Sequence, residues 1–184
     1  MKKLISWLAA LVLAMGLGLI VPGSANAAAP YCGITWGSQA KSKTGDVTLP
    51  HIPHVKDIRA GQHRCFDRLV VDLDGKLKGY SVGYEQFRGI GSGEPIPLRG
   101  TDLVITVDAP AYDDKGRSTY KFRNARELVD VRDYRTFRQV AWGGSFEAQT
   151  SVGLGVRARL PFRAFLLDGP GKGSRLVVDV AHRW

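Results

Sequence analysis

The sequence predicts an all-β protein, an antiparallel β-sandwich of two sheets with at most one short helix after an N-terminal signal peptide. From about residue 58 onward, short runs alternate between apolar and polar residues, the period of two typical of strands. Gly-rich turn signals separate these runs. The phrase "RLVVDL" (68–73) returns as "RLVVDV" (175–180), and the roughly one hundred residues between the two copies contain no convincing helical pattern. The pattern of strands and turns by itself argues for an antiparallel β-sandwich or barrel.

The first 27 residues have the pattern of a secretory signal. Lys2 and Lys3 form a positive start, residues 4–21 are an apolar core, and "SANA" (24–27) provides an A-x-A cleavage site. The apolar stretch approaches the length of a membrane anchor. However, a Pro-Gly break follows it without a basic stop-transfer cluster, so we favour a removed signal and no transmembrane anchor after cleavage. The sequence thus predicts a secreted, extracytoplasmic protein.

The exported part, residues 28–184, has the size of one domain and is cationic. Removing residues 1–27 leaves 157 residues and takes two lysines away, so the formal net charge of +9 becomes +7. Such a charge favours anionic partners such as phosphate polymers, carboxylate-bearing peptides or lipid headgroups, and it also keeps a secreted protein soluble. Nucleic acid is disfavoured as a partner because of export. We expect a monomer.

Two cysteines, Cys32 and Cys65, lie in the exported part. An even pair in an oxidising compartment predicts one disulfide. Free thiols or a catalytic thiol are the alternatives, but Cys65 precedes a strand and no C-x-x-C spacing occurs. Residues 28–57, which are polar and rich in Pro and Gly, are accordingly predicted to be an arm tethered by the disulfide, and residues 58–184 to be the sandwich domain.

The strands and turns of the domain can be assigned in order from the alternation and the turn residues. Strands are expected at 68–73, 80–85, 103–108, 145–159, 161–168 and 174–182. Turns are expected at 74–75, 91–93, 99–100, 114–116, 143–144 and 169–173. The stretch 124–142 is ambiguous: we interpret 124–132 as a short strand or irregular segment and 133–139 as a single helical turn.

The two RLVVD copies predict equivalent strands in two halves of the sandwich. In each copy Leu and the second Val (Leu69 and Val71; Leu176 and Val178) face one way, while Arg, the first Val and Asp face the other. Chance recurrence of common strand residues is the alternative. On either interpretation the phrase indicates architecture rather than a duplicated active site.

A possible catalytic motif, "GYSVG" (79–83), matches G-x-S-x-G, and Asp179 and His182 follow in the order of a hydrolase triad. Such a serine needs a strained turn between a strand and a helix. Ser81 instead lies inside an alternating strand, and no helices are predicted to build the parent fold. The sequence therefore does not predict an enzyme.

Metal and phosphate sites are not predicted either. His51 and His54 flank an Ile-Pro pair that forbids a helical face, and no third ligand lies at a recognised spacing. Asp72 and Asp74 lack the later oxygen ligands of a calcium loop. The glycine-rich stretches 89–97 and 169–174 run into prolines or a strand rather than a helix. No cofactor is expected.

Basic residues carry the strongest functional signal. Arginine's planar fork suits phosphate and carboxylate, so an anion-binding face is expected, although a solvated face with salt bridges to Glu127, Asp130 and Asp133 is the alternative. The candidate anion-binding residues are Arg117, Lys121, Arg123, Arg126, Arg132, Arg135, Arg138, Arg157, Arg159 and Arg163. Aromatic residues that either stack on sugar rings or fill the core are Trp36, Tyr80, Tyr84, Tyr112, Tyr120, Trp142 and Trp184.

Six segments of the exported part are similar in sequence to a known family. They are "CGITWGS" (32–38), "CFDRLVVDLDG" (65–75), "GYSVGY" (79–84), "LVITVDAPAYD" (103–113), "GSFEAQTSVGLGVRARLPFRAFLLDGP" (144–170) and "RLVVDVAHRW" (175–184). Together they resemble the AMIN-like domain of exported actinobacterial proteins, which is related to the AMIN domain of cell-wall amidases. The resemblance implies a β-sandwich of two sheets that binds peptidoglycan and has no catalytic role. It supplies no ligand-binding residues to carry over.

The functional prediction is a non-catalytic, secreted and cell-wall-associated module that binds peptidoglycan or an anionic wall polymer. An envelope protein is a second possible partner. The alternative function is an exported protein-interaction or small-ligand-binding sandwich without wall affinity.

Overall fold

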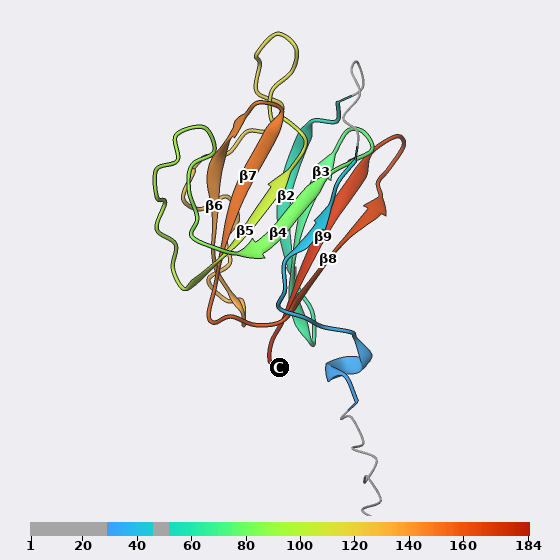
Figure 1. The fold of residues 1–184 in the computed structure, drawn as a ribbon, viewed down its shortest axis with the longest axis vertical. Helices are drawn as coiled ribbons and strands as arrows, with labels where there is room; N and C mark the ends of the chain where they lie inside the picture. Colours follow the sequence, from blue (N-terminus) through green and yellow to red (C-terminus); the bar gives the residue numbers. More distant parts are fainter. Residues whose placement is uncertain (1–28, 46–51) are drawn as a thin grey trace, which may run out of the picture.

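A computed structural model describes residues 29–45 and 52–184, which form two antiparallel sheets packed face to face (Figure 1). The five-stranded sheet has the order β1 (Lys41–Lys43), β4 (Tyr80–Tyr84), β5 (Thr101–Val107), β7 (Gln149–Val156) and β6 (Phe137–Phe146). The four-stranded sheet has the order β2 (Val55–Gln62), β3 (Phe66–Leu73), β9 (Ser174–Ala181) and β8 (Phe162–Asp168). A single 3₁₀ turn, η1 (Tyr31–Gly33), is the one helical element of the described residues. The predicted β-sandwich is confirmed.

The core lies between the two sheets and follows from the period of two. Alternate side chains of each strand face inward, so β-branched and leucine side chains of both sheets meet in one apolar layer. The largest fully buried side chains of this layer include Leu69, Leu103, Ile105, Phe137, Leu154, Phe162 and Leu176.

The two RLVVD copies lie side by side as the central strands β3 and β9 of one sheet. The antiparallel register places Arg68 opposite Asp179 and Asp72 opposite Arg175. Each arginine thus lies opposite an aspartate, and of these two pairs Arg68 and Asp179 form an ion pair. Asp72 pairs instead with Arg59 on β2, and Arg175 donates to the carbonyl of Asp168. The predicted inward faces are confirmed, since Leu and the second Val of each copy are buried in the core. Their placement in two halves of the sandwich was wrong.

The predicted single strand 145–159 is a hairpin. β6 continues to Phe146, and β7 starts at Gln149 after a turn in which Glu147 and Ala148 have φ of 47° and 62°. This turn escaped prediction because it uses a left-handed conformation without glycine.

The turn expected at 143–144 lies inside β6, where the register shifts between Trp142 and Gly144. Glycine is needed there for close packing rather than for reversal. A Cβ at Gly143 would lie 2.7 Å from the ring of Phe87, which covers the outer face of the five-stranded sheet.

The range 28–57, predicted to be a tethered arm, contains β1 and the start of β2. One further prediction was wrong: residues 133–139 form no helical turn, because β6 begins at Phe137. Its start is held by the carboxylate of Asp67, which accepts hydrogen bonds from the N–H groups of Thr136 (2.6 Å) and Phe137 (3.2 Å). Residues 124–132 are irregular, one of the two interpretations offered above.

The disulfide is confirmed. Cys32 and Cys65 are bonded, with a Cα–Cα distance of 6.4 Å, and the N–H of Phe162 donates to the carbonyl of Gly37 (2.8 Å). The arm is thereby attached at one end of the four-stranded sheet, where β3 and β8 both begin. The predicted signal at 1–27 lies outside the described residues. Within the described ranges, no helix is long and apolar enough to cross a membrane.

Candidate functional site

Residues 119–136, here called the crossing segment, cover one open side of the sandwich between the edges β2 and β6. At its start, the hydroxyl of Thr119 donates to the carbonyl of Val55 in β2 (2.8 Å). Near its end, the amide of Gln62 donates to the carbonyl of Asp133 (3.1 Å). These bonds attach an irregular chain to the four-stranded sheet and shield that edge from other strands.

The same segment is bonded to the free edge of β6 in the other sheet. The N–H of Leu128 donates to Val140 O (2.8 Å), and the N–H of Trp142 donates to Ala125 O (2.7 Å). The buried amide of Gln139 also donates to the carbonyl of Arg126 (2.9 Å). The segment is therefore fixed at many points although it has no regular secondary structure, and its side chains are held in place.

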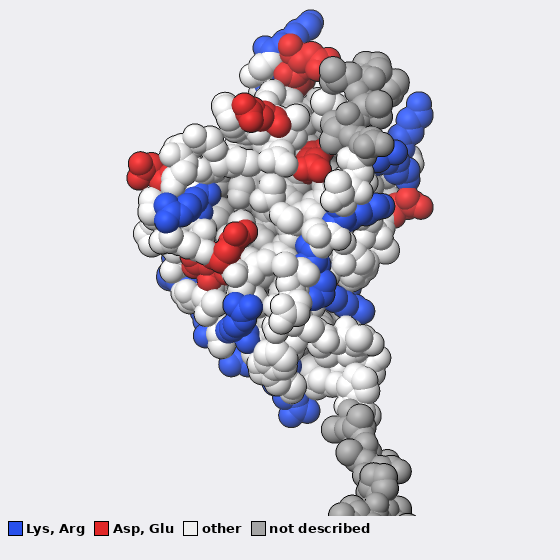
Figure 2. Space-filling model, in the orientation of Figure 1, with Lys and Arg blue, Asp and Glu red and all other residues white. Residues whose placement is uncertain are grey.

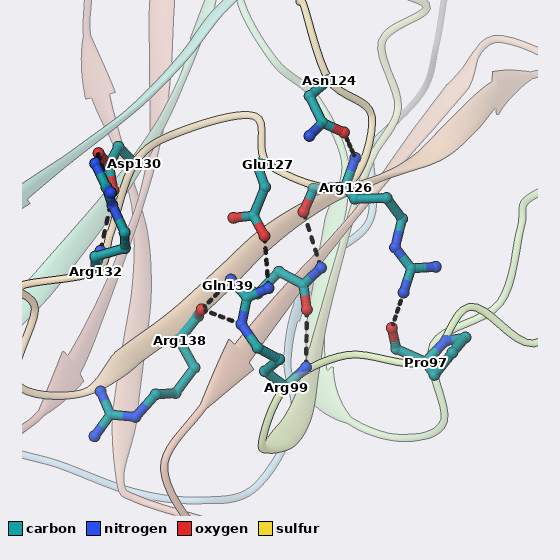
Figure 3. A network of polar contacts seen from close by, with 9 residues as sticks. All are labelled: Pro97, Arg99, Asn124, Arg126, Glu127, Asp130, Arg132, Arg138 and Gln139. Atoms are coloured by element: carbon teal, nitrogen blue, oxygen red, sulfur yellow. Dashed lines mark hydrogen bonds and ion pairs between the residues drawn. The ribbon is translucent and has the colours of Figure 1, made fainter.

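An arginine hollow of about 630 Å³ opens where the crossing segment meets β6 and the β4–β5 connection. Figure 3 shows Glu127 beside Arg99, whose guanidinium also donates to the carbonyl of Arg138 (2.8 Å). Arg99 and Glu127 form an ion pair of 2.6 Å, and Arg132 pairs with Asp130 at 2.6 Å. The hollow is lined by Arg99, Glu127, Asp130, Val131, Arg132, Phe137 and Arg138.

The pairs in the hollow shift the pKa values of their members in the direction expected for ion pairs. The hydrogen-bonded guanidinium of Arg132 lowers the pKa of Asp130 to about 2. The pKa of Arg99 is raised, chiefly by its hydrogen bond to Glu127. Arg99 and Arg132, the partners of the two carboxylates, are therefore charged at any physiological pH. The hollow keeps its pattern of charges over that range.

Two more arginines at this site donate to neutral carbonyls, so no carboxylate offsets their positive charge. Arg126 donates to the carbonyl of Pro97 (2.9 Å), and Arg138 donates to the carbonyls of Phe137 (2.8 Å) and Tyr134 (3.1 Å) (Figure 3). In and beside the hollow there are thus four arginines and the two carboxylates of the ion pairs, and Arg126 and Arg138 point away from these carboxylates (Figure 3). The surface carries an excess of positive charge.

A cationic aromatic face, defined as Tyr120, Lys121, Phe122, Arg123 and Trp142, adjoins the hollow. The rings of Phe122 and Trp142 are 5.2 Å apart, and Tyr120 packs against both at 5.7 and 5.8 Å. Phe122 is 38% exposed, so its ring is presented to solvent with the other two behind it. Lys121 and Arg123 make no hydrogen bond or ion pair with the part of the chain that the structure describes, and both are exposed.

The structure divides the ten predicted anion-binding residues into two groups. Five of them, Lys121, Arg123, Arg126, Arg132 and Arg138, lie together on the crossing segment and the adjoining start of β6. Arg135 is close in sequence, and its carbonyl accepts from Arg138. Figure 2 shows Lys and Arg predominating over the lower part of the face in view, whereas the visible Asp and Glu lie mostly higher.

The remaining four residues lie elsewhere with different partners. Arg117 pairs with Asp113 at 2.6 Å in an exposed turn, and Arg159 lies over the ring of Tyr84. Arg157 donates to the carbonyl of His182, and Arg163 pairs with Asp179 at 2.7 Å. The predicted set is therefore not one continuous face.

The residues of the possible triad make no hydrogen bond with one another among the described residues. Ser81 lies on β4 of the five-stranded sheet, as expected for a strand residue. Asp179 is held by arginines on the four-stranded sheet, and His182 contacts Asp67 (3.1 Å). His54 pairs with Asp74 (3.2 Å), whereas His51 lies outside the described residues. No group of three His, Cys, Asp or Glu in the described ranges is placed to hold a metal ion.

Sequence reasoning missed Phe122 and Arg99. The sequence could have indicated Phe122, because an aromatic residue between two basic residues, here Lys121 and Arg123, is typical of a surface that combines stacking with charge. Arg99 lies about 28 residues from its partner Glu127, and no local pattern connects them.

The comparison with protein-family models decides the family, because the AMIN-like domain model matches residues 53–182. The chain belongs to the AMIN-like domain family. The match starts just before β2 and contains every strand except β1. AMIN-like domains occur in exported proteins and are generally non-catalytic binding modules, and the family suggests a role in binding related to peptidoglycan. Searches of curated proteins and of solved structures return no match for this chain.

Proposed function

We propose that this AMIN-like domain binds peptidoglycan or an anionic cell-wall polymer outside the cytoplasmic membrane and catalyses no reaction. The observation that carries the proposal is the convergence of exposed cations with an exposed aromatic ring on the crossing segment. The binding surface would consist of the cationic aromatic face and the adjoining arginine hollow.

The chemistry of the surface suits a wall glycan. The exposed ring of Phe122, backed by Trp142, offers an apolar platform on which the carbon face of a sugar packs. Lys121 and Arg123 lie on either side in sequence and are free to pair with carboxylates or phosphates of the polymer. Attraction between exposed charges is screened by salt, so binding at this surface should weaken as ionic strength rises.

Export is supported by three independent features. The sequence predicts a secretory signal, the cysteines form a disulfide, which persists in oxidising compartments, and AMIN-like domains occur in exported proteins. A location at the cell wall places the cationic surface beside the polymer it is proposed to bind.

Co-sedimentation of residues 28–184 with purified cell-wall sacculi over a NaCl series tests the proposal. We expect binding at low salt that falls as NaCl rises. The variant Lys121→Gln/Arg123→Gln should lose most of the bound fraction, and Phe122→Ala should lose part of it at every salt concentration. The matched control is Lys115→Gln/Lys172→Gln, which removes the same charge from exposed turns away from the crossing segment.

The two possible failures have distinct meanings. If the wild-type protein stays in the supernatant at low salt, wall binding is wrong and a protein or small-ligand partner becomes the better explanation. If the control variant loses as much binding as Lys121→Gln/Arg123→Gln, attraction is set by overall charge and the crossing segment is not the site.

A further inference from the structure

The outer face of the four-stranded sheet contains a second cluster of charges, built around Asp179. The side chain of Asp179 is fully buried, and Arg68 grips it with two hydrogen bonds of 2.6 and 2.9 Å. Arg163 reaches the same carboxylate from the other side, with bonds of 2.8 and 2.7 Å. These three residues, here called the arginine clamp, place two positive charges on one negative charge.

The clamp follows from the register of three neighbouring strands. Arg68 on β3 and Arg163 on β8 both lie directly opposite Asp179 on β9. Each guanidinium uses Nε and Nη2 for the aspartate, and Nη1 of each has no acceptor among the described residues. The side chains of Arg68 and Arg163 remain 25% and 33% exposed, so a net positive charge is accessible from solvent.

Aromatic rings surround this charge. The guanidinium of Arg163 lies 5.0 Å from the ring centre of Phe165, 5.4 Å from that of Phe66 and 5.6 Å from that of Trp36. Trp36 belongs to the arm, and its indole N–H donates to the carbonyl of Tyr31 (2.8 Å) next to the disulfide. The clamp is thus pre-organised, with rigid apolar walls around an uncompensated cation.

The clamp lies next to the edge strand β8, whose backbone is only partly used. The N–H of Phe162 points to this edge, where it donates to Gly37 O. Since antiparallel pairing alternates along a strand, the main-chain groups of Ala164 and Leu166 face the same edge. Ala164 O accepts from the hydroxyl of Tyr80 at 3.3 Å, and Leu166 has no main-chain partner on that side within the described residues. The N–H of Ala164 and the main-chain groups of Leu166 are therefore the groups of this edge, among the described residues, that an extended peptide could bond.

We propose that the arginine clamp binds the C-terminal carboxylate of an extended peptide whose last side chain is apolar. The surplus positive charge matches one carboxylate, the guanidiniums offer planar donors to it, and the rings of Phe165 and Trp36 accept the neighbouring side chain. A peptide fits better than an acidic sugar, because it brings main-chain groups to the free edge of β8. This inference concerns a different surface from the crossing segment and does not rest on wall binding.

A titration followed by ¹H–¹⁵N NMR tests the clamp without any substitution. The probe is the tripeptide Ala-Ala-Leu as its free acid, compared with its C-terminal amide. We expect the acid to shift the Nε–H signals of Arg68 and Arg163 and the indole signal of Trp36. The amide should bind at least about tenfold more weakly, because it lacks the charge that the clamp attracts.

A matched pair of variants adds a second measurement. Arg163→Lys keeps the charge but loses the planar fork, and we expect about a tenfold loss of affinity for the acid. Arg59→Lys makes the same change on the same sheet face, where Arg59 has Asp72 as its own partner (2.6 Å), and should leave the affinity unchanged. The backbone spectra of both variants report whether the fold is intact.

Three results would overturn the inference. Equal affinity for the acid and the amide would show that the clamp recognises no carboxylate. If glucuronate bound with the same affinity as the peptide acid, the clamp would not recognise the peptide chain. Shifts confined to the crossing segment would place the site elsewhere. None of these results bears on sedimentation with sacculi, which depends on Lys121 and Arg123.

Discussion

The arginine clamp and the arginine hollow are both built from arginines, but the partners of these arginines differ in burial. In the clamp, regular strands bury one aspartate completely beneath two arginines. In the hollow, an irregular segment holds arginines against exposed carboxylates and neutral carbonyls. A buried carboxylate makes its partners essential to the fold, whereas exposed pairs contribute little to stability and leave charge available. The burial of the partner carboxylate, rather than the arginine itself, decides how strongly each cluster contributes to the stability of the fold.

The largest difference between the two regions should appear when each loses its aspartate. Asp179→Ala leaves two partly buried guanidiniums without an anion, and we expect it to lower the free energy of unfolding by roughly 3 to 5 kcal/mol. Asp130→Ala, the exposed counterpart, should leave the unfolding midpoint unchanged within error. Urea denaturation followed by circular dichroism measures both. Equal losses would mean that burial does not distinguish the two regions.

The disulfide lies on the clamp side of the molecule, next to the arm that carries Trp36. Replacing both Cys32 and Cys65 by serine should cost about 3 to 4 kcal/mol, because the bond closes a loop of about 33 residues in the unfolded chain. It should also free Trp36 from its place beside Arg163, while signals of the crossing segment stay in position. NMR spectra of the serine variant check this, and shifts spread evenly over both regions would contradict it.

High pH should destabilise the fold through two tyrosines, the partly buried Tyr84 on β4 and the buried Tyr120 of the cationic aromatic face. Burial raises the pKa of Tyr84 and of Tyr120 to about 12, above the ordinary value of 10. The neutral phenols are therefore favoured in the folded state, and their contribution is complete below pH 10 and disappears as the pH rises from 10 to 12. Tyr84→Phe and Tyr120→Phe should each make the unfolding midpoint less dependent on pH in that window. An unchanged slope in both variants would be inconsistent with burial of the phenols.

The smallest expected effect concerns the ionisation of Asp130. Because its pKa of about 2 results from the hydrogen bonds of Arg132, Arg132→Gln should raise it toward the ordinary value near 4. In the wild type the carboxylate stays ionised until the pH falls through about 2, so the ion pair persists over the whole range used for binding assays. An NMR titration of the Asp130 side chain measures the shift. A value that does not move would show that Arg132 is not its partner in solution.

Much of the fold could be predicted because strand periodicity is local. The inward faces of Leu69 and Val71, and of Leu176 and Val178, follow from alternation alone. The turn at Glu147 and Ala148 could not be predicted, since its left-handed residues are not the ones that favour such turns. The strand order was also inaccessible, because pairing of β3 with β9 depends on contacts across about one hundred residues.

The candidate site could be predicted only in part. A basic stretch with aromatic residues indicated the crossing segment, and the charge of Lys121 and Arg123 is indeed exposed there. The role of Arg163 depends on Asp179 lying opposite it in a neighbouring strand, which needs the register of the sheet. Sequence therefore located the cations but not their partners, and the partners decide which cations are free to bind a ligand.

The most direct test of the central claim is an NMR titration of ¹⁵N-labelled residues 28–184 with soluble disaccharide-peptide fragments of peptidoglycan. Binding through the crossing segment predicts the largest shifts at Lys121, Phe122, Arg123 and the indole of Trp142, with smaller ones at Arg132. Shifts confined to β3, β8 and β9, or to the outer face of the five-stranded sheet, would contradict it.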